Sequence, residues 1–122
     1  MHDSLTLQPE PRSAGEARHF VATHVQNHLP RELTEVAVLL TSELVTNVIV
    51  HARTPMQLTV DLTDEALRVA IADGAVRTPV RRQTEGNARL TGRGMHLVES
   101  LANDWGVDPT PAGKTVWFEL SA

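Results

Sequence analysis

The pattern of apolar and polar positions predicts two helices in the first half of the chain. Between residues 30 and 52, apolar side chains recur at steps of three and four, so they stack on one side of a helix. An earlier helix is expected from residue 13 to about residue 28, with Ser13 as its N-cap and Glu16 as the capping-box partner. Pro30 suits the first turn of the second helix. The apolar stripe of that helix consists of Leu33, Val36, Ala37, Leu40, Leu44 and Val48.

Strict alternation of apolar and polar residues predicts the strands. Residues 56–62 and 66–72 alternate on either side of a short turn, which is typical of an antiparallel hairpin with one face packed on helices. Residues 4–8 indicate a weaker edge strand, residues 115–120 a final strand, and residues 95–103 a third helix. This order of elements predicts an α/β two-layer sandwich, with helices on one face of a mostly antiparallel mixed sheet. The 122 residues are expected to form a single domain over 1–122.

Composition narrows the functional class. A formal net charge of −4 and an aromatic fraction of 3% argue against nucleic-acid binding, which normally uses basic surfaces and stacking side chains. Cysteine is absent, so neither a disulfide framework nor a thiolate metal site is expected. The N-terminus lacks a signal-peptide pattern, and no apolar run is long enough to suggest a membrane helix. We therefore expect a cytoplasmic domain without membrane contact.

Candidate chemistry begins with a polar row on the long helix. Glu43, Asn47 and His51 are four residues apart and border the apolar stripe, on a face that is expected to be partly buried. Burying such groups without partners costs about 1–3 kcal/mol each, so they need a ligand or a neighbour. A solvated helix face is the simpler alternative, and the pattern alone leaves both open.

A second candidate is the segment from residue 76 to residue 93. It is rich in arginine, poor in large apolar side chains and without periodicity, which is typical of functional loops but also of a disordered insertion. Gly92-Arg93-Gly94 then opens the third helix. Glycines at a helix start let the backbone amides approach an anion such as phosphate.

Four short motifs stand in order on suitable elements: Glu43-x-x-x-Asn47, Asp73-Gly74, Gly92-Arg93-Gly94 and Gly113-Lys114-Thr115. The series resembles the GHKL (Bergerat) ATP-binding fold of gyrase, histidine kinases and MutL. Within that superfamily, the stretches around Glu43 and Gly94 are similar to those of the small anti-sigma factor serine/threonine kinases of the RsbW and SpoIIAB type. The resemblance covers roughly residues 5–120.

The resemblance implies a role for each motif. Glu43 would be the general base for an attacking hydroxyl, and Asn47 would give its side-chain oxygen to Mg²⁺. Asp73 would accept a hydrogen bond from the adenine amino group, with Thr115 beside it under the ring. The segment 76–93 would be a lid over the nucleotide. The residues implied to contact ATP are Asn47, Asp73, Gly74, Gly92, Arg93, Gly94, Met95 and Thr115.

The same resemblance implies a kinase that phosphorylates a small anti-anti-sigma (STAS-type) partner and exchanges it for a sigma factor. A homodimer is compatible with the same resemblance. One departure leaves an alternative open. The family has glycines two and four residues after the aspartate, whereas this chain has Ala75 and Arg77. A β-carbon there limits backbone approach to the base, so a catalytically degenerate domain that only binds partners is the alternative. A sensor-type kinase acting on histidine is disfavoured, because the chain has no dimerisation helix pair.

Overall fold

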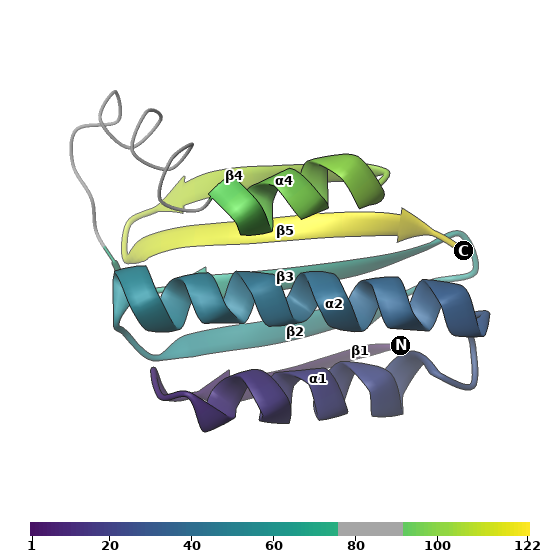
Figure 1. Cartoon of the computed structure of the whole chain (residues 1–122), viewed down its shortest axis with the longest axis horizontal. Coiled ribbons are helices and arrows are strands. Elements are labelled where there is room, and N and C mark those ends of the chain that lie inside the picture. Colours follow the sequence, from purple (N-terminus) through teal and green to yellow (C-terminus); the bar gives the residue numbers. More distant parts are fainter. Residues whose placement is uncertain (76–91) are drawn as a thin grey trace.

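The computed structural model of the chain describes residues 1–75 and 92–122, with side chains from residue 96 onward in the second part. Its elements follow the order β1, α1, α2, η1, β2, β3, α4, β4 and β5 (Figure 1). The helical elements are α1 (Arg12–Val25), α2 (Arg31–Asn47), η1 (Val48–Ala52) and α4 (Gly92–Leu101). The strands are β1 (His2–Leu7), β2 (Met56–Leu62), β3 (Ala66–Asp73), β4 (Asp104–Thr110) and β5 (Gly113–Ser121).

The strands of the described residues form one sheet of five, in the order β1-β2-β3-β5-β4, and every neighbouring pair is antiparallel. The predicted hairpin is present as β2 and β3, with Met56 opposite Asp73 and Leu62 opposite Leu67. β5 follows β3 in space although a helix and a strand separate them in the chain. The predicted α/β two-layer sandwich is confirmed, and its sheet is wholly antiparallel rather than mixed.

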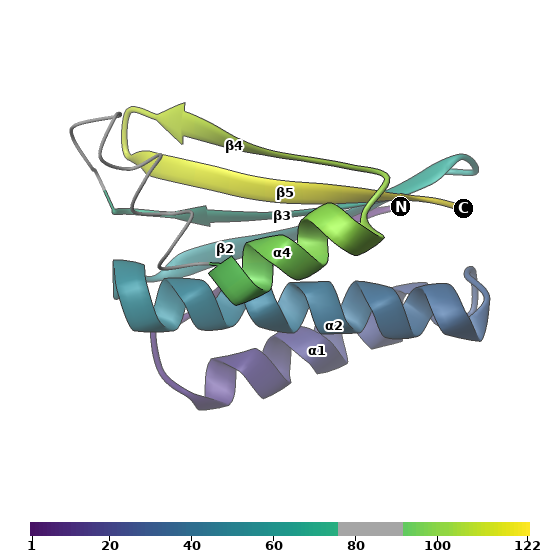
Figure 2. The same cartoon turned by 45° about the horizontal axis from the view of Figure 1, so that its top comes forward.

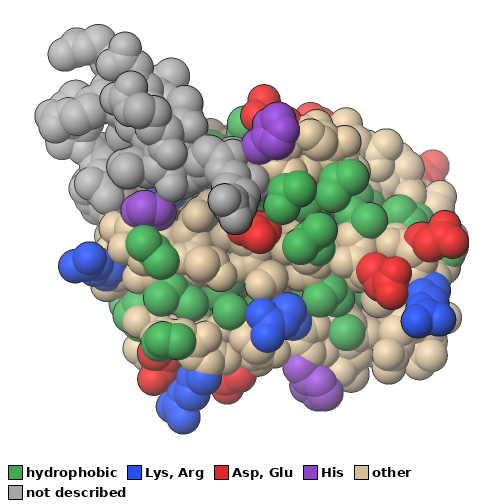
Figure 3. All heavy atoms as spheres, viewed as in Figure 1, with side chains coloured by type: hydrophobic (Ala, Val, Ile, Leu, Met, Phe, Trp, Pro, Cys, Tyr) green, Lys and Arg blue, Asp and Glu red, His purple; other side chains and the backbone are tan. Residues whose placement is uncertain are grey.

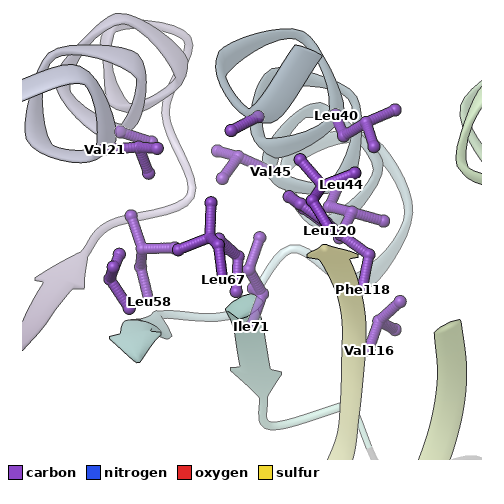
Figure 4. Packing of buried hydrophobic residues seen from close by; sticks show 14 of the residues in the cluster. Val21, Leu40, Leu44, Val45, Leu58, Leu67, Ile71, Val116, Phe118 and Leu120 are labelled. Carbon is purple, nitrogen blue, oxygen red and sulfur yellow. The ribbon is translucent and has the colours of Figure 1, made fainter. Parts of the chain in front are cut away.

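All the helices cover one face of the sheet (Figure 2). Alternation along the strands sends every second side chain toward them, and Leu58, Ile71 and Phe118 are fully buried in this way (Figure 4). From the helices, Val21, Leu40 and Val45 pack against this face, and they also have no exposed surface. The core is aliphatic around a single buried aromatic ring, Phe118, so shape complementarity of branched side chains sets the spacing of the two layers.

The predicted capping box of α1 is wrong. The helix begins one residue earlier, at Arg12, and its N-cap is Pro11, which has no side-chain cap bond. Ser13 is buried inside the first turn, and its hydroxyl donates a 2.6 Å hydrogen bond to the carbonyl oxygen of Gln8. This bond ties the helix to the end of β1, so Ser13 joins two elements instead of capping one.

The long predicted helix is not α-helical to its end. α2 stops at Asn47, and the five residues of η1 form a π-helix, closed by a 2.8 Å bond from the Arg53 amide to the Val48 carbonyl. By length and hydropathy the segment Arg31–Ala52 would also pass as a membrane span. Its apolar side chains, including Ala37, Leu40 and Leu44, pack into the core instead.

Candidate nucleotide site

The polar row of α2 lies on the flank that faces α4. α1 contacts the opposite flank, where Arg18 donates a 3.1 Å hydrogen bond to Ser42. A step of one residue turns the helix by about 100°, so Glu43 and Asn47 lie away from α1, and the views in Figures 1 and 2 place α4 on that side. Both side chains are half-buried. A solvated helix face therefore does not describe this row.

Asn47 carries an unpaired polar group at this place. Its Nδ2 is buried and has no hydrogen-bond partner in the part of the chain that the structure describes. Within the same part, the Glu43 carboxylate makes no ion pair and no hydrogen bond. A buried unpaired amide costs about 1–3 kcal/mol, and the half-buried Glu43 carboxylate next to it adds a charged acceptor. The pair is thus a place where a polar ligand would stabilise the fold.

The change of helix type begins directly after Asn47. π-helical turns widen a helix and are frequent at functional sites. Arg53 ends the turn in the left-handed region, with φ 58° and ψ 36°. This reversal brings the Thr54 hydroxyl to the end of β3, where it accepts a 2.9 Å hydrogen bond from the Gly74 amide. The end of the long helix and the end of β3 are therefore joined next to the polar row.

Asp73 closes β3 with a side chain that has no exposed surface. Its Oδ1 accepts a 2.9 Å bond from the Ala75 amide, and its Oδ2 accepts a 2.8 Å bond from the Lys114 ammonium. Lys114 is the direct cross-strand neighbour of Asp73 on β5. Gly113, just before it, has no room for a side chain, because a β-carbon would overlap the Asp73 carbonyl oxygen. The start of β5 is thus pressed against the end of β3.

Thr115, which was expected beside Asp73, is not the direct cross-strand neighbour of that residue. Thr115 pairs with Ala72, one residue away from Asp73 in the ladder, and side chains alternate along a strand. Its side chain is on the outer face of the sheet, and Thr115 lines a shallow hollow of about 420 Å³ together with Thr6, Gln57 and Asp73. Lys114 occupies the position next to Asp73 that the motif suggested for Thr115.

The phosphate-binding motif forms the first turn of α4. The helix begins at Gly92 rather than at Met95, so the backbone of Gly92, Arg93, Gly94 and Met95 is helical. The amides of a first helical turn have no partner inside the helix, and the helix dipole favours an anion there. The side chains of these four residues lie outside the described residues, and so do residues 76–91 of the lid predicted over 76–93.

These parts converge on one end of the molecule. η1 and β3 both end there, and α4 begins there (Figure 1). The arrangement offers a carboxylate acceptor at the sheet, helix-start amides without a partner inside their helix, and the side-chain amide and carboxylate of Asn47 and Glu43 on the neighbouring helix. These donors and acceptors complement a molecule that has a hydrogen-bonding ring at one end and phosphates at the other.

The described residues also restrict what metal could bind. They contain no group of three or more His, Cys, Asp or Glu side chains able to hold an ion. An ion bound through Asn47 would need most of its ligands from phosphate oxygens and water. Mg²⁺ binds in this manner, through one or two protein oxygens plus substrate phosphates, so the donor set fits Mg²⁺ that arrives with a nucleotide.

Comparison with known proteins agrees with this geometry. The family model described as "Histidine kinase-like ATPase domain" matches residues 7–120, which is nearly the whole chain. No curated protein matches the sequence. The matched range includes every element that contributes to the site, from the polar row of α2 to the Lys114 position on β5.

Proposed function

Since the chain belongs to the histidine kinase-like ATPase domain family, and so to the ATP-binding GHKL fold, we propose that it is an Mg²⁺-dependent protein serine/threonine kinase. Its substrate would be a small anti-anti-sigma protein of the STAS type, and a sigma factor would compete for the same kinase in the cytoplasm. The observation that carries the enzymatic part is the half-buried pair of Glu43 and Asn47, in which Nδ2 of Asn47 has no partner among the described residues.

Each described residue has a definite task in this proposal. Asp73 would accept a hydrogen bond from the base, and the first-turn amides of α4 would hold phosphate oxygens. Asn47 would orient Mg²⁺, which neutralises charge on the phosphates. The hydroxyl oxygen of the partner's serine or threonine forms a bond to the γ-phosphorus, and the bond from that phosphorus to the β,γ-bridging oxygen breaks. Glu43 takes the hydroxyl proton, and ADP leaves.

A protein partner is also consistent with the surface around the site. Large apolar side chains remain exposed over the helical layer (Figure 3). Val50 is 50% exposed one turn beyond Asn47, and Leu39 is 41% exposed one turn before Glu43. Apolar side chains close to a catalytic pair support docking of a macromolecular substrate. A second copy of the chain could use the same surface, and a homodimer is part of the proposal.

A binding module without turnover is the second candidate. It is favoured by Ala75, which stands where the family has a glycine and whose β-carbon limits the approach of backbone to the base. In this candidate the domain would sequester its partner without phosphorylating it.

Two measurements test the proposal and separate the candidates. Isothermal titration with ATP should show binding that requires Mg²⁺ and is weaker for GTP. Incubation with labelled ATP and STAS-domain proteins should label a serine or threonine. Binding without labelling of any STAS partner favours the binding module, and no ATP binding by the unmodified chain rejects both nucleotide-dependent candidates.

Two variants assign the roles. Glu43→Ala should keep ATP affinity and lose phosphoryl transfer, because the carboxylate acts on the hydroxyl and not on the nucleotide. Asn47→Ala should lose Mg²⁺-dependent ATP binding. The matched controls are Glu16→Ala and Asn27→Ala, which remove the same groups from exposed positions on or after α1 and should change neither property. Equal loss of ATP binding in both site variants would contradict the separate roles.

A further inference from the structure

We propose that Lys114 reads the nucleotide base together with Asp73: its ammonium donates a hydrogen bond to ring nitrogen N1 of adenine while Asp73 accepts one from the amino group at C6. This inference rests on the proposed ATP-binding function and adds a specificity-determining residue to it. The observation behind it is the cross-strand pair itself, with Nζ of Lys114 2.8 Å from Oδ2 of Asp73.

Both side chains are on the sheet face that the helices cover. Alternation places Asp73 on the side of Ile71, and Lys114 on the side of Val116, and Figure 4 shows those two neighbours pointing toward the helical layer. Asp73 has no exposed surface, whereas the Lys114 side chain keeps 24%. The solvent-exposed member of the pair is therefore Lys114, and a base that reaches the Asp73 carboxylate meets the ammonium next to it.

The hydrogen-bonding capacity of the pair fits one edge of adenine. An ionised carboxylate only accepts, with about four lone-pair positions, and an ammonium only donates, with three hydrogens. Asp73 uses one position for Lys114 and one for the Ala75 amide, so two remain. Lys114 uses one hydrogen for Asp73. The adjacent amino group and N1 of adenine supply a donor and an acceptor side by side, so the base can bind without breaking the ion pair.

The positions of the motif residues in the sheet favour Lys114 as the donor to N1 of adenine. Thr115, the other polar residue of the motif, points to the opposite face of the sheet. The absence of space beside Gly113 holds the start of β5 against the end of β3, which fixes the two backbones that carry the pair. Guanine presents its acceptor and donor in the reverse order on this edge, so it would have to shift to use the same two groups.

The chain's composition supplies a direct probe. Ten of its eleven basic residues are arginine, and Lys114 is the single lysine. Labelling the lysine side chain with ¹³C at Cε therefore gives signals from this residue alone. The comparison ligand is 1-deaza-ATP, in which a C–H group replaces N1 and the rest of the base is retained. Both ligands bring the same ring current to the site, so a difference between them reports the hydrogen bond to N1.

The binding experiment measures the affinities of the unmodified chain and of Lys114→Met for ATP and for 1-deaza-ATP, with Mg²⁺ present. The unmodified chain should bind 1-deaza-ATP roughly tenfold more weakly than ATP, as expected for loss of one hydrogen bond to a charged group. Lys114→Met should bind both ligands equally. The control ligand is 7-deaza-ATP, which is altered on another edge and should bind both proteins with the same ratio to ATP.

The NMR measurement does not depend on the variant being stable. In the unmodified chain, ATP should shift the Lys114 signal and 1-deaza-ATP should shift it much less. If ATP binds but the two ligands give the same shift and the measured affinities show no coupling, the role of Lys114 is overturned while the proposed function stands. If the unmodified chain binds no ATP, the proposed function fails and the role of Lys114 fails with it.

Discussion

The substitution Lys114→Met removes the ammonium of the buried ion pair. Its effect on the stability of the nucleotide-free protein tests how much this pair stabilises the ends of β3 and β5. In Lys114→Met the Asp73 carboxylate, which has no exposed surface, keeps only the Ala75 amide as a partner within residues 1–75 and 92–122. Breaking a buried ion pair by removing one member costs about 3–5 kcal/mol. The 24% exposure of Lys114 and the retained amide bond put the expected loss at the lower end, about 3 kcal/mol.

Thermal unfolding followed by circular dichroism measures this loss. Unfolding entropy is about 2.1 cal/mol/K per residue, so for 122 residues a loss of this size lowers Tm by about 12 °C. The double variant Asp73→Asn with Lys114→Met should regain at least about 1 kcal/mol over the single variant, because no charge is left buried. Arg31→Ala is the control, since the Arg31–Glu35 pair is 91% and 66% exposed and should contribute nothing measurable.

Two results would refute this reasoning. One is an unfolding free energy of Lys114→Met within about 0.5 kcal/mol of the unmodified chain, which is the range of an ordinary surface substitution. The other is a double variant less stable than the single one. Either result would mean that water reaches the Asp73 carboxylate and that the ion pair is a surface contact.

Further predictions concern other parts of the fold. Asn47→Leu should leave the unfolding free energy unchanged or raise it by about 1 kcal/mol, because an unpaired buried amide is removed, while the stabilisation by Mg-ATP in a thermal-shift assay disappears. Gly113→Ala should cost about 1–3 kcal/mol in urea unfolding because its β-carbon overlaps backbone, whereas Gly15→Ala, where the nearest atom is the tip of an arginine, should raise stability by about 0.5–1 kcal/mol. Asp3→Asn should lower the free energy of unfolding most between pH 3.8 and 6.5. Hydrogen bonds to a backbone carbonyl and to Asp3 raise the pKa of His24. The hydrogen bond from His24 lowers the pKa of Asp3. The pair's contribution is therefore lost as pH rises through the raised His24 value and as it falls through the lowered Asp3 value, and urea unfolding at about pH 5.5 and 8.5 measures the difference.

The sequence was sufficient to predict the helices and strands in which apolar residues recur over a long stretch or alternate strictly. The hairpin of β2 and β3 appeared at its predicted residues within one position, because seven or eight alternating residues define a buried face. The long apolar stripe predicted the core side of α2 for the same reason. Glu43 and Asn47 could be selected because four-residue spacing places both side chains on one flank.

Features that depend on specific hydrogen bonds or on strand register were not predicted. Ser13 has the composition of an N-cap, but its hydroxyl bonds the chain five residues earlier. The π-helical turn after Asn47 leaves the apolar pattern unchanged and so gives no signal in sequence. The face on which Thr115 lies depends on the register between β3 and β5, and motif spacing does not contain that register. Lys114 was visible as the only lysine, yet its role required the same register.

The position of β3 and β5 in the sheet has an evolutionary consequence. Each of these strands has a hydrogen-bonded neighbour on both sides, whereas β1 and β4 form the borders of the sheet. Border strands can acquire substitutions, insertions or docking partners while the inner ladder keeps its register. Relatives of this domain could therefore diversify their protein contacts along β1 and β4 and retain an unchanged nucleotide preference.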